Sequence, residues 1–551
     1  MRKIISKQSL LLLSIILIGG VFRFYRLTDF PVQLNHDEIS QLYDAISIAE
    51  TGKDVYGNFM PTIFPSVNDF KSPFYTYITS LFYLFLGNKE VIIKLPGVIF
   101  GWLTIIAVYF FVLKLFKNWR IAICASFFTA ISPFEIFFSR KSFENVAGIF
   151  FMLFGFASLL AYIDKKSNTR MLYIGFLFLA IATYTYFSHA ILIPFLLFSF
   201  VLIYREHFLN NVKRVLLPVL VLGVLLVPLV LIIITNPGAR YRSKTVFITQ
   251  DVNLERNIEY SKSENYLTSF LLKNKAILDF SFNRYLEQFN VDFIFANGLD
   301  FTGERLLNQG LLLLIQLPLF VLGLIYLIRL NGFKQAKMFI LAWILLGMLP
   351  SGLTFESHSP HRSIMVFTML NIICAVGFYW FIQITKKSKR FFYPLICLFA
   401  LALIFNFMYF IHMYFVNFPF ERSQHIQYPF KQVALYAWSQ YQNFDSIIFD
   451  PQFGDFEPKI GAGAYYYFAY YGQMPPDKFQ KEYRLGDKPR EVLFDKFSIR
   501  EVYWLTDKDL KNTLVIASPW SVREKDIEDK NKIIKRFFFY NGKLAFYAIK
   551  L

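Results

Sequence analysis

Side chains capable of acid–base chemistry gather in a polar stretch that follows the first hydrophobic segment. Asp37 and Glu38 are adjacent carboxylates, and Lys71 follows some thirty residues later, directly before Ser72 and Pro73. A positioned carboxylate can take a proton from a hydroxyl group. A lysine ammonium can hold a phosphate as a compact point charge. If this stretch lies at the outer membrane surface, these groups could act on a substrate delivered in lipid.

Each of these residues also has a simpler explanation. Neighbouring residues on a helix point about 100° apart, so only one of Asp37 and Glu38 can face a given substrate atom. Both acids could merely stabilise the first turn of a helix predicted from about Asp37 to Glu50. Lys71 could be a lysine that anchors a helix to lipid headgroups.

Two further basic segments fall in loops expected outside the cytoplasm. The loop after the apolar run that ends near residue 235 carries Arg240 and Arg242, and the segment before the run near residue 363 carries His361 and Arg362. Basic residues on the outer side run against the positive-inside trend and are therefore informative. Arg362 near a helix N-terminus favours phosphate contact. The histidine and glutamate spacing here matches no standard zinc motif, so we expect no metal site.

Composition identifies the elements that must position these groups. The chain has 551 residues, of which 55% are hydrophobic, and a formal net charge of +18. Apolar runs of about 20 residues recur, and each could cross a bilayer as a helix. The basic residues cluster in the short connections between runs, as the positive-inside rule requires, so the charge does not indicate nucleic acid binding. The three cysteines all lie in apolar runs and predict no disulfide framework.

Eleven predicted spans follow from these runs, and their orientation follows from the basic connections. Arg2, Lys3 and Lys7 precede the first run, which offers no small-residue cleavage site, so we predict an uncleaved anchor with a cytoplasmic N-terminus. Residues 73–87 are short and tyrosine-rich, which favours an interfacial helix within the first outer loop. The predicted spans are 10–21, 91–113, 120–137, 143–163, 170–187, 189–204, 214–235, 309–328, 337–353, 363–382 and 391–413.

The remaining residues, 416–551, differ in character from the rest of the chain. Strand-like runs at 446–450 and 513–517, a helical pattern at 431–440 and a turn at Asn541-Gly542 predict a small α/β domain. The predicted organisation is a transmembrane domain at 1–415 and an extracytoplasmic domain at 416–551. No nucleotide-binding glycine loop occurs, which fits a substrate already held in the membrane.

The arrangement resembles the membrane glycosyltransferases with the GT-C fold, in the group that contains protein O-mannosyltransferases and the bacterial lipid A aminoarabinose transferase. The resemblance covers about the first 415 residues and rests on the order of short motifs along an eleven-span topology. These motifs are Asp37-Glu38, Lys71-Ser72-Pro73, Ser132-Pro133 with Ser139-Arg140, the segment 285–295, and Pro360-His361-Arg362.

The resemblance implies an inverting transfer of a sugar from a polyprenyl phosphate to a hydroxyl outside the cytoplasm. It implies that Asp37 is the general base, that Glu38 supports it, and that Lys71 contacts the carrier phosphate. Either Arg240 or Arg242 would also meet that phosphate, with Arg362 and His361 as further donor-binding residues. The chain departs from its relatives at His36, where a proline is frequent, so the resemblance does not fix the backbone geometry at the start of this helix.

The implied partners are a polyprenyl-phosphate sugar donor, membrane lipid, and an acceptor that is a protein, a glycolipid or a cell-wall glycan. The scheme requires no cofactor. We expect a multi-pass protein of the plasma membrane with its site and its C-terminal domain outside the cytoplasm. One alternative is a transporter or flippase of lipid-linked saccharides, although no internal repeat is visible and the ionisable groups gather at one face. A non-catalytic receptor is a further alternative.

Overall fold

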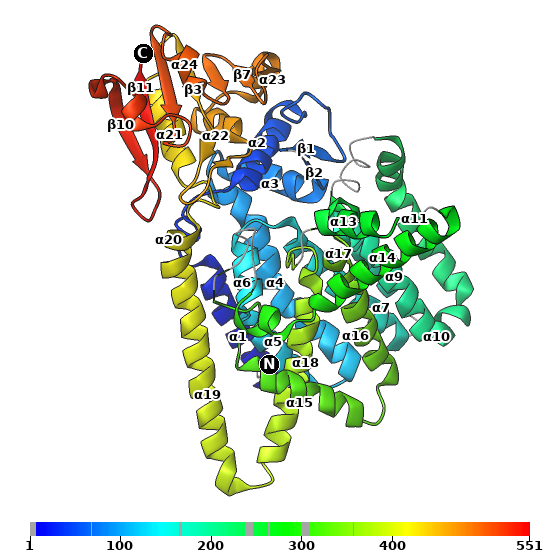
Figure 1. Ribbon diagram of the computed structural model, residues 1–551. Helices are drawn as coiled ribbons and strands as arrows, with labels where there is room; N and C mark the ends of the chain where they lie inside the picture. Colours follow the sequence, from blue (N-terminus) through cyan, green and yellow to red (C-terminus); the bar gives the residue numbers. More distant parts are fainter. Residues whose placement is uncertain are drawn as a thin grey trace. The chain divides into compact units, whose positions relative to one another are not determined.

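The protein consists of a helical part and a part built around a β-sheet (Figure 1). The computed structural model describes residues 7–67, 69–164, 168–236, 246–262, 265–298, 306, 308–355 and 358–551. The chain divides into two compact units. Unit 1 comprises Met1–Tyr25 with Pro96–Met413, and unit 2 comprises Arg26–Leu95 with Tyr414–Leu551. Residues 26–95, predicted within the 1–415 part, therefore cluster with the C-terminal residues.

Unit 1 is built from helices (Figure 1). Its elements are α1 (Lys7–Phe24), α4 (Val91–Phe116), α5 (Trp119–Ala130), α6 (Pro133–Arg140), α7 (Glu144–Asp164), α8 (Arg170–Thr183), α9 (Phe187–Ile203), α10 (Arg205–Leu209), α11 (Val212–Thr235), α13 (Val252–Tyr260), α14 (Tyr266–Glu287), α15 (Gln316–Arg329), α16 (Lys334–Gly347), α17 (Leu349–Gly352), α18 (Ile364–Thr385) and α19 (Lys389–His412), with the short turns η1 (Ile248–Gln250) and η2 (Asp292–Ala296). The predicted polytopic helical fold is confirmed.

Each of the eleven predicted apolar runs contains a helix or a helix pair. Among the described residues, seven helices are long and apolar enough to cross a membrane, which is the pattern of a multi-pass membrane protein. The pair α5 and α6, predicted as one span, bends by 52°. Pro133 at the start of α6 has no N–H to continue the helix, which explains the break. The other three predicted runs form the shorter apolar helices α8, α9 and α15.

Buried arginines satisfy the carbonyl groups at two helix ends in unit 1. Arg140 Nη1 donates to the carbonyl oxygens of Arg23 and Tyr25, each at 2.8 Å, where α1 ends. Arg23 donates to Ala130 O at 3.0 Å and Thr129 O at 3.1 Å, where α5 ends. The last carbonyls of a helix have no partner within the helix, so these guanidinium groups supply one where water is excluded.

Glycines allow close packing of α15 on α18. A Cβ atom on Gly377 would lie 1.9 Å from Leu319 O, and one on Gly323 would lie 2.1 Å from Ile373 O. Only residues without a side chain fit here, as is common where membrane helices pack through their backbones.

Unit 2 joins the first predicted outer loop to the C-terminal residues. Its first segment forms α2 (His36–Thr51), the hairpin β1 (Phe64–Ser66) and β2 (Asp69–Lys71), and α3 (Pro73–Leu86). Its second segment forms η3 (Met413–Asn417), α20 (Phe418–Arg422), α21 (Pro429–Ser439), β3 (Ser446–Phe449), β4 (Gln452–Phe453), β5 (Lys459–Ile460), α22 (Ala464–Tyr471), α23 (Pro476–Glu482), β6 (Arg484–Leu485), β7 (Val492–Phe494), β8 (Phe497–Ile499), α24 (Trp504–Asp507), β9 (Thr513–Ala517), η4 (Glu524–Asp526), η5 (Lys530–Lys532), β10 (Ile533–Phe538) and β11 (Leu544–Lys550).

The main sheet of unit 2 has seven strands in the order β10-β11-β9-β3-β8-β7-β6, with β3 parallel to both of its neighbours. Alternate residues of β3 serve opposite faces. Ile447 and Phe449 join an aromatic-rich core that includes Leu42 of α2 and Phe468 of α22, whereas Ile448 packs in a smaller core on the other face. The predicted C-terminal α/β domain and its hairpin at Asn541-Gly542 are confirmed.

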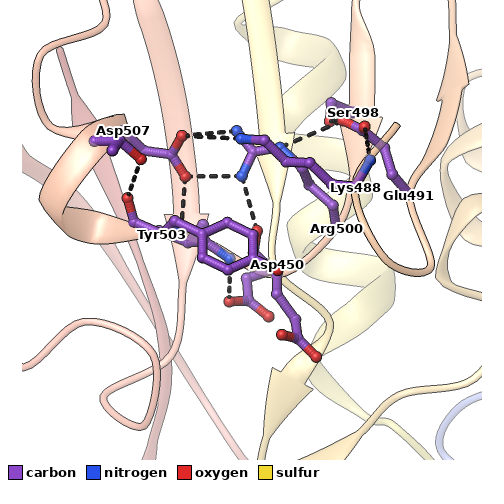
Figure 2. A network of polar contacts seen from close by, with 10 residues as sticks. Asp450, Lys488, Glu491, Ser498, Arg500, Tyr503 and Asp507 are labelled. Atoms are coloured by element: carbon purple, nitrogen blue, oxygen red, sulfur yellow. Dashed lines mark hydrogen bonds and ion pairs between the residues drawn. The ribbon is translucent and has the colours of Figure 1, made fainter. Parts of the chain in front are cut away.

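A buried polar network joins the ends of these parallel strands (Figure 2). Arg500, directly after β8, makes two hydrogen bonds to Asp507, at 2.7 and 2.9 Å. The backbone N–H of Tyr503 donates to the same carboxylate at 2.7 Å, and Ser498 Oγ donates to Glu491 at 2.7 Å. The network stabilises the loops that leave the carboxyl edge of the sheet.

Candidate active site

The first turn of α2 presents Asp37 and uses Glu38 as part of its cap. The N-cap residue Asn35 accepts a hydrogen bond from Glu38 N at 2.8 Å, and the Glu38 carboxylate accepts one from Asn35 N at 2.9 Å. This is a capping box, which is why the helix begins here without a proline at His36. Glu38 is 3% exposed, whereas the Asp37 side chain is 55% exposed. Of the two adjacent acids, therefore, Asp37 is the one available to a substrate.

Lys71 lies against Asp37, although the two are 34 residues apart in the chain. It is the last residue of β2, and its Nζ atom is 3.2 Å from Asp37 Oδ1. The same ammonium group donates to the backbone oxygen of Asp37 at 2.5 Å and to Ser40 Oγ at 3.0 Å. The Lys71 side chain is 9% exposed, so the β1–β2 hairpin holds a largely buried cation beneath an accessible carboxylate.

Residues of the C-terminal segment of unit 2 contact the chain at the start of α2. Tyr467 of α22 donates its hydroxyl hydrogen to Leu34 O at 2.8 Å, one residue before the N-cap. A Cβ atom on Gly463 would lie 3.6 Å from His36 Cβ and 2.7 Å from Val67 Cγ2. Gly463 has φ +61°, which a glycine adopts without strain. The sequence did not predict the role of Tyr467, because tyrosine is frequent throughout the chain and marks no particular contact. It did not predict that of Gly463 either, because a single glycine does not indicate which distant residue lies against it.

His361 and Arg362 lie in unit 1, just before α18. The His361 ring stacks on Phe143, with 6.0 Å between ring centroids and 12° between planes. Its backbone oxygen accepts a hydrogen bond from Asn145 Nδ2. Arg362 precedes Ser363, the N-cap of α18, so its predicted place beside a helix N-terminus is confirmed.

The remaining predicted site residues, Arg240 and Arg242, lie outside the described residues. Within the described ranges, no group of three histidine, cysteine, aspartate or glutamate side chains could hold a metal ion. The structure thus gives two groups of predicted site residues, one in each unit. Asp37, Glu38 and Lys71 form the first group, and His361 and Arg362 form the second.

Solved structures with the same fold cover almost the whole chain. ArnT from Cupriavidus metallidurans, in the apo state and bound to undecaprenyl phosphate, matches over 98% of this chain and 97% of its own, with a TM-score of 0.54 and 12% sequence identity. The chain has the GT-C fold.

Two further comparisons agree with this fold. The archaeal oligosaccharyltransferase AglB from Archaeoglobus fulgidus, in complex with an inhibitory peptide and a dolichol-phosphate, matches over 98% of this GT-C chain and 74% of its own, with a TM-score of 0.51 and 12% identity. The family described as dolichyl-phosphate-mannose-protein mannosyltransferase matches residues 70–233. No protein with a curated description matches in sequence. The predicted resemblance to GT-C glycosyltransferases is confirmed, and both the family and the fold relatives are glycosyltransferases.

Proposed function

We propose that the protein is an inverting glycosyltransferase that moves a sugar from a polyprenyl phosphate to a hydroxyl group outside the cytoplasm. The observation that carries the proposal is the contact between Asp37 and Lys71, in which a largely buried cation holds a half-exposed carboxylate at 3.2 Å. The family match at residues 70–233 and the GT-C relatives with bound undecaprenyl phosphate and dolichol-phosphate support this donor class.

In the proposed reaction, Asp37 accepts the proton of the acceptor hydroxyl as its oxygen attacks the anomeric carbon. The bond between that carbon and the phosphate oxygen breaks, and the phosphate leaves with the electron pair. A single displacement of this kind inverts the anomeric carbon. Glu38 acts as a positioning residue, since its carboxylate closes the cap of the helix that carries Asp37.

Fixed cations would stabilise the negative charge that develops on the departing phosphate. Lys71 is the proposed contact beside Asp37, and either Arg240 or Arg242 is the proposed contact from the loop that follows α11. His361 and Arg362 at the start of α18 complete the proposed donor-binding set. The acceptor is a protein, a glycolipid or a cell-wall glycan. We place the site and the C-terminal domain on the outer face of the plasma membrane, with a cytoplasmic N-terminus.

The test is transfer of radiolabelled sugar from a polyprenyl phosphate by the purified full-length protein. Asp37→Asn keeps the shape of the side chain and removes the base, so transfer is expected to fall by about 10²–10⁴-fold. Asp29→Asn is the matched control, because Asp29 is also half-exposed and pairs with a basic residue, Arg26, at 2.7 Å. Full activity in Asp37→Asn would refute the base assignment, and lipid movement without consumption would indicate a flippase instead.

A second variant tests the cation. Lys71→Ala is expected chiefly to weaken use of the lipid donor, seen as a raised donor KM, because a phosphate contact would be lost. Lys431→Ala serves as the control, since Lys431 forms a surface ion pair with Glu90 in the same unit. Unchanged donor kinetics in Lys71→Ala would argue against its phosphate role.

A further inference from the structure

Three long helices of unit 1 begin close to one another. They are α7, α9 and α18, of 21, 17 and 22 residues. Asn145 in the first turn of α7 donates to the backbone oxygen of His361, two residues before the N-cap of α18. A Cβ atom on Gly148 of α7 would lie 2.1 Å from His189 Nδ1 in the first turn of α9. Tyr186, before α9, has its ring centroid 6.3 Å from that of His361. The three helix starts therefore form one junction.

Buried polar atoms without a hydrogen-bond partner concentrate at this junction. In the part of the chain that the structure describes, such atoms at the three helix starts include Ser142 Oγ, Asn145 Oδ1, Ser188 Oγ, His189 Nε2 and Ser363 Oγ. Native proteins leave few buried polar groups unpaired, because each lost hydrogen bond destabilises the fold. Several at one place indicate a site whose partner is a ligand.

The charge at the junction identifies the ligand's chemistry. Lys141 is 4% exposed and makes no hydrogen bond or ion pair with a described residue. Its Nζ atom lies 5.2 Å from the ring centroid of Phe137 and 5.3 Å from that of Phe143. Burying an ammonium group without a carboxylate or other anion is unfavourable. An anionic ligand would supply the missing partner.

The surrounding residues also carry an excess of positive charge. The segments 140–148, 185–192 and 358–368 contain Arg140, Lys141 and Arg362 but Glu144 as their single carboxylate. One further carboxylate, Glu135, contacts them by accepting a hydrogen bond from Thr368 at 3.1 Å. Arg140 is already engaged with the end of α1. Helix N-termini add free N–H groups and the positive ends of the helix dipoles.

We propose that this junction binds a phosphate group, with Lys141 and Arg362 as its cations and the serine hydroxyls and helix N–H groups as further donors. The inference rests on the proposed function in one respect, which is that the phosphate is the one attached to the polyprenyl donor. A neutral sugar would not compensate a buried ammonium, whereas a phosphate accepts hydrogen bonds from ammonium, guanidinium and hydroxyl groups alike.

Binding measurements on the full-length protein test the site without any turnover. The probes are a polyprenyl phosphate, the matching polyprenol that lacks the phosphate, and inorganic phosphate. Lys141→Met is expected to raise the Kd for the polyprenyl phosphate about tenfold or more, and Ser363→Ala to raise it less. Lys141→Arg should stay near the wild-type value. Lys114→Met is the matched control, since Lys114 pairs with Asp164 at the opposite end of α7.

A stability measurement separates ligand binding from a structural role. Without ligand, Lys141→Met should unfold at the same temperature as the wild type or higher, because an unpaired buried charge has been removed. A lower unfolding temperature together with unchanged binding would mean that Lys141 merely packs on the two phenylalanines, and would overturn the proposal.

The remaining outcomes identify the source of the phosphate. Competition between inorganic phosphate and the polyprenyl phosphate supports a site for the phosphate group itself, whereas inorganic phosphate that binds without displacing the lipid overturns the lipid assignment. Weakened binding by Lys141→Met in a protein that never transfers sugar would leave this site standing and refute the proposed function. Normal binding of the polyprenyl phosphate by Lys141→Met, in a protein that does transfer sugar, would refute this site and leave the proposed function standing.

Discussion

Two buried polar clusters in this protein differ in one respect, which is whether their atoms are paired. Around Arg500 in unit 2, guanidinium, carboxylate, hydroxyl and backbone N–H groups bond to one another at 2.7–2.9 Å (Figure 2). At the start of α7, α9 and α18 in unit 1, several buried polar atoms have no partner among the described residues, and the Lys141 ammonium lies over two aromatic rings.

The paired cluster around Arg500 stabilises the fold, whereas the unpaired cluster in unit 1 is the proposed ligand-binding site. A network whose members satisfy one another stabilises the structure, while a partly satisfied one destabilises it until something binds. Clusters of the second kind are expected at functional sites, where stability is sacrificed for binding.

Of the replacements within the two clusters, the largest effect is expected from breaking the paired one. Arg500→Met would leave Asp507 buried without its guanidinium partner, and we expect a loss of about 3–5 kcal/mol in the local stability of unit 2. Arg523→Met is the control, because Arg523 is 66% exposed in its pair with Asp526 and should contribute about 1 kcal/mol or less. Hydrogen exchange of the β3 and β8 amides measures both. Equal protection in the two variants would show that the Arg500 network does not stabilise the sheet.

Asp44 on α2 is intermediate between the paired and the unpaired cluster, because it is buried with a single hydrogen bond to a described residue. It accepts a hydrogen bond from Val55 N at 3.1 Å, yet burial, and to a smaller extent the nearby Asp54, raises the pKa of its carboxyl to about 8. In the unfolded chain the same group ionises near pH 3.8. The neutral form is therefore favoured by folding, and the stability it contributes is complete below pH 3.8 and is lost as the pH rises to about 8.

Asp44→Asn should abolish that loss, which amounts to about 1.4 kcal/mol per pH unit between the two pKa values. Thermal unfolding midpoints between pH 4 and pH 8 measure it. The wild type is expected to lose stability relative to the variant across this range, and parallel curves would contradict the prediction.

The smallest expected effect compares two buried serines of similar exposure. Ser498→Ala removes a hydrogen bond to the Glu491 carboxylate and should cost about 1.5–3 kcal/mol. Ser188→Ala removes a hydroxyl with no partner among the described residues, so stability should stay within about 0.5 kcal/mol or rise. Denaturant or thermal unfolding of ligand-free protein measures both. A large loss of stability in Ser188→Ala would mean that the Ser188 hydroxyl does make a hydrogen bond in the ligand-free protein.

Local sequence signals predicted much of this fold. The length of the apolar runs located the helices, the alternation at 446–450 and 513–517 located β3 and β9, and Asn541-Gly542 located the last hairpin. The acids at Asp37 and Glu38 marked the start of α2, which runs from His36 to Thr51. These signals depend on neighbours within a few residues and need no knowledge of the distant chain.

The packing of segments that are far apart in the chain could not be predicted from such local signals. No pattern indicates that residues 26–95 pack with 414–551, because a chain with 19% aromatic residues offers many equivalent partners for its aromatic helices. The family resemblance assigned roles to Asp37 and Lys71, but neither it nor their spacing predicted the ion pair between them. Lys141 was overlooked, although it lies in a predicted outer segment and breaks the positive-inside trend as Arg240 and Arg242 do. The division of roles between 1–415 and 416–551 stays a prediction.

Unit 2 is formed by two chain segments that the ribosome makes at very different times. The helix that carries Asp37 is among the first segments to leave the ribosome, yet Tyr467, which holds Leu34, is made more than four hundred residues later. The strand β11, which lies between β10 and β9 in the sheet, is made later still. Asp37 therefore lacks this support until the second segment of unit 2 has been made, so a chain terminated before Tyr467 would insert its helices and still lack an assembled centre.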